Sequence, residues 1–152
     1  MILCGILGCR EELTTGYSFE EHMIMPVSSV IESTQVRAVV DHFMTSWIDG
    51  NLEGVMSVMA DDAVFVATTG PEPGRSFRGL DEIGRLFASL VSRSSPTRMR
   101  VESTFVVGDT AIVLWTTTDT TKKAAEATMK GLDVFRVRNG LIVLKDAYRK
   151  SY

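Results

Sequence analysis

The chain has 152 residues and a formal net charge of -3 at pH 7, and 45% of its residues are hydrophobic. A chain of this length forms about one domain and buries roughly two-thirds of its unfolded surface, which is enough for one core with a cavity but not for a second core. The 16 lysine and arginine residues are scattered along the sequence. Because they form no basic stripe that could neutralise phosphates, we expect no nucleic-acid partner.

The N-terminal segment lacks a regular period. Its 33 residues mix glycine, cysteine, threonine and serine without the spacing of a helix or a strand. We therefore expect residues 1–33 to be a loosely ordered extension and residues 34–152 to form the domain. A start of translation at Met23 or Met25 is the alternative interpretation.

Both cysteines, Cys4 and Cys9, lie in this segment. They are too few for a disulfide framework and have no second Cys/His pair to complete a zinc site, so we expect ordinary thiols in a reducing compartment and no metal. Residues 1–8 are apolar, but they are too short to span a bilayer and lack a positively charged n-region. The sequence predicts a cytoplasmic protein without a membrane anchor.

Three segments have the apolar spacing of amphipathic helices. The first begins at Ser33-Thr34, which can act as an N-cap, and Gly50 ends it. The second extends from Leu52 to Met59 and is closed by Asp61-Asp62, and the third follows Gly79. The three apolar stripes are Val36, Val39, Val40, Phe43 and Trp47; Leu52, Val55, Met56 and Met59; and Leu80, Ile83, Leu86, Phe87 and Leu90.

The other periodic segments predict strands. Residues 63–68 are rich in β-forming residues, and a loop of Gly and Pro follows them. Period-two alternation predicts four more strands near residues 99–105, 111–121, 127–137 and 141–149. Gly108-Asp109 and Asn139-Gly140 are tight-turn signals that join these strands into hairpins. The side chains expected to share one face of the first hairpin strand are Met99, Val101, Ser103 and Phe105.

The element order is helix, helix, strand, helix and then four strands. Short turns between strands permit antiparallel hairpins, and a sheet of this size must bury one face. We therefore expect an α+β fold, in which a curved, mixed but mostly antiparallel sheet forms a cone-shaped barrel around the three helices. The wedge-shaped interior would hold one apolar pocket.

This arrangement resembles the nuclear-transport-factor-2-like superfamily, often called SnoaL-like, over about residues 33–148. The superfamily hosts isomerases, epoxide hydrolases, polyketide cyclases and non-catalytic binding proteins. The segments that carry the resemblance are 47–52 (WIDGNL), 59–65 (MADDAVF), 77–79 (FRG) and 131–140 (GLDVFRVRNG).

Within the superfamily, residues 63–69, the following Gly-containing loop and Phe77-Arg78-Gly79 are similar to the SgcJ/EcaC-type subgroup. Some members of that subgroup belong to biosynthetic pathways for enediyne and other polyketide antibiotics. No Gly-rich dinucleotide loop follows a predicted strand, so we expect no nicotinamide and no other cofactor.

Asp133 is the first candidate catalytic residue. It lies mid-strand between apolar residues, where ketosteroid isomerases of this superfamily place a carboxylic acid that donates a hydrogen bond. In an apolar pocket desolvation disfavours a carboxylate, and a neutral acid can stabilise a developing oxyanion. The positions that match the isomerase's general base and oxyanion tyrosine hold Ala67 and Phe43, so steroid-type proton transfer is not expected. A bond to a neighbouring donor or a salt bridge to an arginine is the alternative role.

Asp119 is the second candidate, at the place where limonene-epoxide-hydrolase-like members carry one acid of an Asp-Arg-Asp trio. If Asp119 faces inward, Trp115 and Thr117 also do so by alternation, and Thr117 stands where that trio has its arginine. Asp146 comes one residue too early for the second acid, so Ala147 takes the inward position unless a bulge intervenes. A solvated acid near a strand end is the alternative for Asp119.

Large apolar side chains should line the substrate-binding pocket, although each of them can equally be plain core. The predicted wall is Phe43, Trp47, Met59, Phe65, Phe87, Trp115 and Phe135, with Thr117 as a polar member. Trp115 is the strongest of these candidates, because its indole N–H requires a partner and it shares a strand face with Asp119.

Two hypotheses for the function follow. The first is a pocket protein of secondary metabolism that binds a hydrophobic, polyketide-like intermediate, such as one of an enediyne pathway. Asp133 and Asp119 would perform cofactor-independent acid/base chemistry on it, as in a cyclase, isomerase or hydrolase. The second is a non-catalytic ligand-binding or accessory protein. In either case the resemblance implies a homodimer through the outer sheet face, where Leu132, Val134 and Arg136 alternate opposite Asp133.

Overall fold

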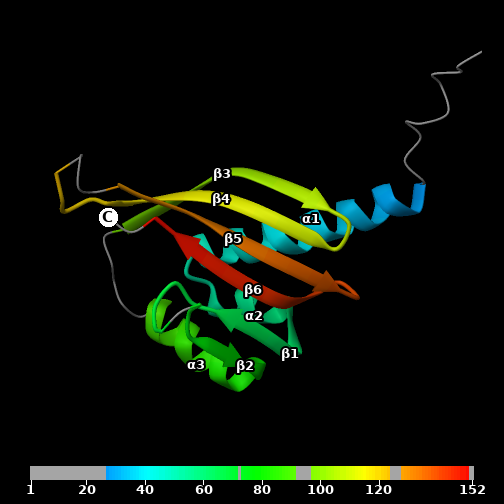
Figure 1. Cartoon of the computed structure of the whole chain (residues 1–152), viewed down its shortest axis with the longest axis horizontal. Coiled ribbons are helices and arrows are strands. Elements are labelled where there is room, and N and C mark those ends of the chain that lie inside the picture. The colour runs from blue at the N-terminus through cyan, green and yellow to red at the C-terminus, as the bar shows by residue number, and fades with distance from the viewer. Residues whose placement is uncertain (1–26, 72, 92–96, 124–127, 151–152) are drawn as a thin grey trace, which may run out of the picture.

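The computed structural model describes residues 27–71, 73–91, 97–123 and 128–150, which form three helices and six strands (Figure 1). In chain order these are α1 (Val27–Ile48), α2 (Leu52–Ser57), β1 (Met59–Val66), β2 (Ser76–Arg78), α3 (Gly79–Val91), β3 (Thr97–Val107), β4 (Thr110–Asp119), β5 (Thr128–Arg138) and β6 (Leu141–Arg149). No helix within the described ranges is long and apolar enough to cross a membrane.

The strands form one curved sheet in the order β2-β1-β6-β5-β4-β3. β1 and β6 run parallel, and all other neighbours run antiparallel. The helices cover one face: α1 contacts β3 to β6, and α3 contacts β1 and β2. Figure 1 shows the long strands passing in front of α1, with α3 beside β1 and β2. The expected α+β cone of a mixed, mostly antiparallel sheet around three helices is confirmed.

Aromatic side chains dominate the core between the helices and the inner sheet face. Phe43 of α1 meets Phe135 of β5 edge-on, with ring centroids 5.2 Å apart, and Phe87 of α3 meets Phe65 of β1 at the same distance. Burying such a side chain stabilises a fold by about 1.5–3 kcal/mol, and an edge-on pair adds about 1 kcal/mol. This aromatic cluster holds α1 and α3 against the sheet.

A bulge in β3 changes which of its side chains face inward. Val101 pairs with Trp115 of β4, whereas Ser103 pairs with the next residue, Leu114, so that Glu102 is an extra residue in the strand. One extra residue exchanges the two faces of everything beyond it. The expectation that Ser103 and Phe105 share a face with Met99 and Val101 was wrong, and the Phe105 side chain is 57% exposed.

The hairpin between β5 and β6 has the predicted tight turn. Asn139 and Gly140 have φ values of 53° and 77°, and positive φ at both central residues is what the favoured two-residue hairpin turn requires. A strict register from this turn, which pairs Arg138 with Leu141, would place Lys145 beside Val134 on the outer face.

A second bulge overrides that register. Val137 pairs with Ile142 and Arg136 with Leu144, so the residue between Ile142 and Leu144 is extra. From there on every side chain of β6 changes face, and Lys145 lies opposite Phe135 on the inner side. This bulge decides the composition of the site described below.

Two element boundaries and one short strand differ from the sequence prediction. α1 begins at Val27 instead of Ser33, because no Gly or Pro interrupts residues 27–33. Residues 1–26 lie outside the described part of the chain. Met59 belongs to β1 and not to the second helix, since the Ile142 backbone N–H donates to the Val58 carbonyl and draws the chain into the sheet at this point. The short edge strand β2 had not been predicted.

Candidate functional site

A cavity of about 510 Å³ lies between the C-terminal ends of α1 and α3 and the inner faces of β3 to β6. Its volume falls in the range typical of small-molecule sites. The apolar lining side chains are Trp47, Ile48, Leu90, Val91, Met99, Trp115, Met129 and Ala147, and the polar ones are Thr68, Thr117, Asp133, Lys145 and Arg149. A largely apolar wall with few polar groups is suited to a hydrophobic ligand.

Asp133 and Lys145 form a buried ion pair on the wall of this cavity. The Lys145 Nζ atom lies 2.8 Å from Asp133 Oδ2, and the two residues are 7% and 3% exposed. Removing charges from water costs several kcal/mol per ion, which the attraction within a pair offsets only when its geometry is good. The pair therefore places two opposite charges, with their strong electric field, at the wall of a largely apolar cavity.

Three phenyl rings enclose the Lys145 ammonium group. Its Nζ atom lies 5.0 Å from the ring centroid of Phe65, 5.5 Å from that of Phe135 and 5.9 Å from that of Phe43. Ring faces attract cations, by up to about 2 kcal/mol where water is excluded. The rings and Asp133 together hold the ammonium group in place.

The strand patterns explain how the pair is assembled. Asp133 faces inward because β5 alternates, with Phe135 and Val137 buried on the same side. Lys145 faces inward because of the bulge in β6, which also places Ala147 directly opposite Asp133. Ala147 was expected to face inward unless a bulge intervened. It does face inward, but the reasoning was wrong, because the bulge is what brings it there.

Two buried polar atoms on the cavity-lining residues have no partner within the described residues. Asp133 Oδ1 is an acceptor, and Trp115 Nε1 is a donor. Buried polar groups are nearly always hydrogen-bonded, and an unpaired one costs about 1–3 kcal/mol. Both atoms belong to residues that line the cavity and are themselves almost completely buried.

Trp115 is held in place by a close approach to the neighbouring strand. Its ring lies against Gly131 of β5, where an added Cβ atom would collide with the ring and with the Tyr148 carbonyl oxygen. Gly131 is thus needed for space, since its φ angle is not in the left-handed region. This contact positions one wall of the cavity.

The structure does not bring Asp119 together with Asp133. Asp119 is not among the cavity-lining residues, and on β4 it is six residues from Val113, the partner of Asp133, which corresponds to roughly 20 Å of strand. Its Oδ1 atom accepts hydrogen bonds from the Thr121 hydroxyl at 2.6 Å and the Thr121 N–H at 2.9 Å. The hydroxyl bond first, then the N–H bond and the Lys122 ammonium, hold the pKa of Asp119 below its usual value.

The predicted wall divides into two groups. Trp47, Trp115 and Thr117 line the cavity. The other predicted wall residues are not among its lining residues and are buried in the core: Phe43, Met59, Phe65, Phe87 and Phe135. Sequence spacing predicts burial for both groups, because core and cavity side chains share one inner face.

Lys145 was missed by the sequence prediction. For Asp133, a neighbouring donor was one of the roles left open, and that donor is Lys145 instead of an arginine. No local signal singles out Lys145, because counting from the hairpin turn places it beside Val134 on the outer face. Met99, Met129 and Arg149 also line the cavity without having been predicted.

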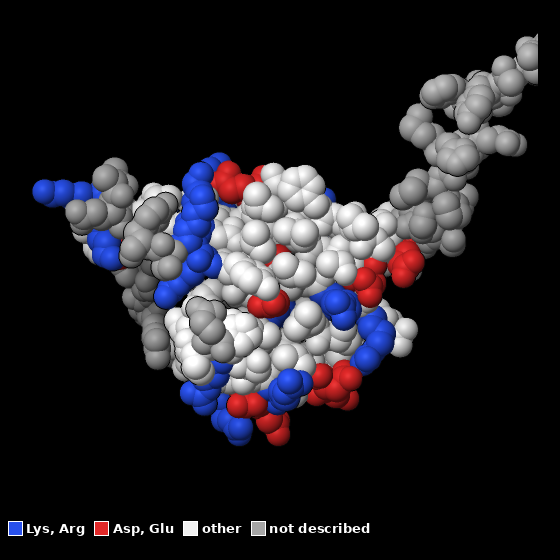
Figure 2. All heavy atoms as spheres, viewed as in Figure 1, with Lys and Arg blue, Asp and Glu red and all other residues white. Residues whose placement is uncertain are grey.

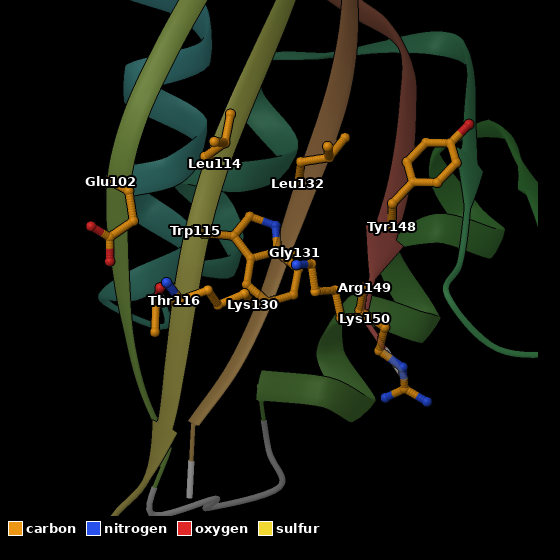
Figure 3. A pocket seen from close by; sticks show the side chains of 10 residues that line it. All are labelled: Glu102, Leu114, Trp115, Thr116, Lys130, Gly131, Leu132, Tyr148, Arg149 and Lys150. Atoms are coloured by element: carbon orange, nitrogen blue, oxygen red, sulfur yellow. The ribbon is translucent and has the colours of Figure 1, made fainter. Parts of the chain in front are cut away.

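The outer sheet face carries a second hollow of about 490 Å³. Leu114, Leu132 and Tyr148 line it together with charged side chains (Figure 3). Leu114 is 37% and Tyr148 52% exposed. The Tyr148 hydroxyl donates to Asp146 at 2.7 Å, and this hydrogen bond, with the nearby carboxylate charge, raises the pKa of Tyr148. Figure 2 shows a largely uncharged centre on this face with charged side chains toward its edges.

A cone of six strands around three helices, with one apolar cavity that reaches a buried polar pair, defines a protein of the nuclear-transport-factor-2-like type. The SnoaL-like domain family matches residues 40–145, and the chain belongs to that family. No protein of curated function matches the chain.

Solved structures share the fold. A nuclear-transport-factor-2-like protein of unknown function from Mesorhizobium loti has a TM-score of 0.68 and 23% identity, over 79% of this chain and 94% of that chain. A candidate ketosteroid isomerase from Kribbella flavida has a TM-score of 0.66 and 15% identity, over 80% and 82%. A candidate polyketide cyclase from Sinorhizobium meliloti has a TM-score of 0.61 and 16% identity, over 76% and 97%.

Proposed function

We propose that this protein binds a small hydrophobic molecule of the polyketide type in the inner cavity and performs acid/base chemistry on it with Asp133. The observation that carries the proposal is a buried carboxylate on the wall of an apolar cavity, with one oxygen bonded to Lys145 and the other without a partner among the described residues. A buried, specifically paired titratable group in a cavity is typical of a functional site.

In this proposal Asp133 Oδ1 is the reacting atom. It accepts a proton from a C–H or O–H group of the ligand and returns it to another position, as a cofactor-independent isomerase or cyclase requires. The contact of Lys145 with Oδ2 orients the carboxylate. The names of the compared Kribbella flavida and Sinorhizobium meliloti proteins support this reaction class. The resemblance to the SgcJ/EcaC-type subgroup supports a ligand from enediyne or related pathways.

The test begins with the ligand and ends with one substitution. Compounds that remain bound through native purification are extracted and identified by mass spectrometry, and the recovered compound serves as the substrate. Asp133→Asn is expected to lower its turnover about 100-fold or more, the usual contribution of a general acid or base. The dissociation constant, measured by quenching of the cavity tryptophans, should change little.

Asp146→Asn is the matched control, because Asp146 lies on the neighbouring strand β6, beside Val134, but bonds to Tyr148 on the outer face. It should leave turnover unchanged. If Asp133→Asn turns over the compound at the wild-type rate, the catalytic role of Asp133 is lost and a binding protein remains.

A homodimer through the outer sheet face is the second part of the proposal, and it suits a binding or accessory role as well as an enzyme. The hollow combines the apolar side chains of Leu114 and Leu132 and the ring of Tyr148 with charged side chains, a mixture that is also found at protein interfaces. Both signs of charge are present among the lining side chains, with Glu102 and Lys130 as examples. A face of this kind can pair with a copy of itself.

Leu114→Arg tests the dimer. A charge at the centre of the interface is expected to raise the dimer dissociation constant by about 30-fold or more, the effect of losing a hot-spot residue. Analytical ultracentrifugation at micromolar concentration measures it, with Glu53→Arg in the first turn of α2 as the control. A wild-type monomer under these conditions would refute the dimer.

A further inference from the structure

Lys145 occupies an unusual place for a lysine. Among the described residues it is the only lysine or arginine that is buried, and its ammonium group has Asp133 as its one charged partner, at 2.8 Å. The surroundings are otherwise three phenyl rings. Long basic side chains normally extend their charged ends into water.

Stability does not account for this arrangement. A buried ion pair contributes little compared with apolar side chains of similar volume, because desolvation offsets the attraction. Both Asp133 and Lys145 also line the cavity in which a ligand would bind. Ala147, opposite Asp133, has a small side chain that leaves room beside the pair. An amine and a proton carrier are therefore in contact with each other and with ligand space.

We propose that Lys145 forms a reversible imine with a ligand that carries an aldehyde or ketone group, with Asp133 transferring the protons. This proposal rests on the proposed function, because it uses the same cavity as the ligand site. Imine formation needs a desolvated amine and a group that removes and returns its proton, and here the apolar surroundings of Lys145 and the carboxylate of Asp133 supply these two.

The reaction balances within the pair and the ligand. Asp133 takes a proton from the Lys145 ammonium group, and the free Nζ lone pair attacks the carbonyl carbon, whose oxygen takes the nitrogen's proton to give a carbinolamine. Asp133 then protonates the carbinolamine hydroxyl, which leaves as water while the nitrogen lone pair forms the C=N bond. The product is a protonated imine paired with the Asp133 carboxylate, so one positive and one negative charge are present before and after.

Reductive trapping of the full-length protein tests the proposal. Naphthaldehyde is the probe, cyanoborohydride reduces any imine, and peptide mapping by mass spectrometry locates the adduct. Labelling of Lys145 should exceed that of each exposed lysine, such as Lys122 or Lys150, by about tenfold or more, because the cavity concentrates the probe beside the amine. Naphthalenemethanol, which has the same ring system without a carbonyl group, should compete with this labelling.

Two variants serve as controls. Lys145→Arg keeps a cation beside Asp133 but cannot form the imine, so the cavity adduct should vanish. Thr117→Phe, which places a ring in the cavity, should lower labelling of Lys145 while the exposed lysines are labelled as before. The site is mapped in the wild-type protein, so the result does not depend on how well a variant folds.

The outcomes separate this proposal from the one on which it rests. Both tryptophans of the chain, Trp47 and Trp115, line the cavity, so quenching of their fluorescence reports probe binding. Quenching with labelling at Lys145 supports the imine. Quenching without an adduct, or an adduct spread evenly over the exposed lysines, overturns the imine and leaves the binding pocket. If neither the aldehyde nor the alcohol quenches the fluorescence and the aldehyde gives no adduct, both the imine and the binding pocket are overturned.

Discussion

Lys145→Met is expected to lower the free energy of unfolding by about 3–5 kcal/mol, because it leaves the Asp133 carboxylate buried without its cation. Asp133→Asn should also destabilise, since it leaves the ammonium group without an opposite charge. The double variant should recover a large part of the loss, because no uncompensated charge remains. Urea unfolding of the four proteins gives the coupling energy of the pair.

The exposed pair of Asp62 and Arg138 is the control for this cycle. Arg138 Nη2 lies 2.8 Å from both Asp62 carboxylate oxygens, and the guanidinium hydrogen bond lowers the pKa of Asp62. Both side chains are more than half exposed, so Arg138→Met should have a far smaller effect than Lys145→Met. If Lys145→Met and Arg138→Met lower the free energy of unfolding equally, Lys145 is not buried as described.

Gly131→Ala is expected to destabilise the protein by about 2–3 kcal/mol, at the upper end of what overpacking usually costs. The added methyl group would collide with the Trp115 ring on one side and with the backbone carbonyl of Tyr148 on the other. The carbonyl belongs to the sheet ladder and cannot move freely, so Trp115 must shift and change the cavity wall. Urea unfolding and the emission maximum of tryptophan fluorescence measure both effects.

Gly84→Ala is the matched control. An added Cβ atom at Gly84, in α3, would meet only the end of the flexible Met56 side chain, at 3.5 Å. Alanine favours helix over glycine, so this variant should be neutral or slightly stabilising. If Gly131→Ala also leaves stability and tryptophan emission unchanged, Trp115 is not wedged against β5.

The fold was largely predictable because its signals are local. The apolar stripes of α1 and α3 bury Val36, Phe43 and Phe87 as predicted, and Asn139-Gly140 makes the predicted turn. Periodicity and turn chemistry act over a few residues, so they can be read directly from the chain. The sequence prediction missed the start of α1 and placed Met59 in a helix instead of a strand, since these boundaries depend on packing and on pairing with β6.

The candidate site was predictable in part. Asp133 was identified from its mid-strand place between apolar residues and from the resemblance to ketosteroid isomerases, and it lies on the cavity wall. Asp119 was chosen from the resemblance to limonene-epoxide-hydrolase-like proteins, but in the structure its carboxylate accepts hydrogen bonds from Thr121 in the adjoining turn. Its catalytic role stays a prediction without support from the site geometry.

The sequence by itself determined the element order, the helix stripes, the hairpins and the inward position of Asp133, because each follows from a period or a turn within one segment. Only the tertiary structure decided the partner of Asp133. A single extra residue at Val143 turns Lys145 from the outer to the inner face of β6, and a bulge leaves almost no mark in the local pattern. Its position is set by how β6 fits between β1 and β5, which pair with it in opposite directions.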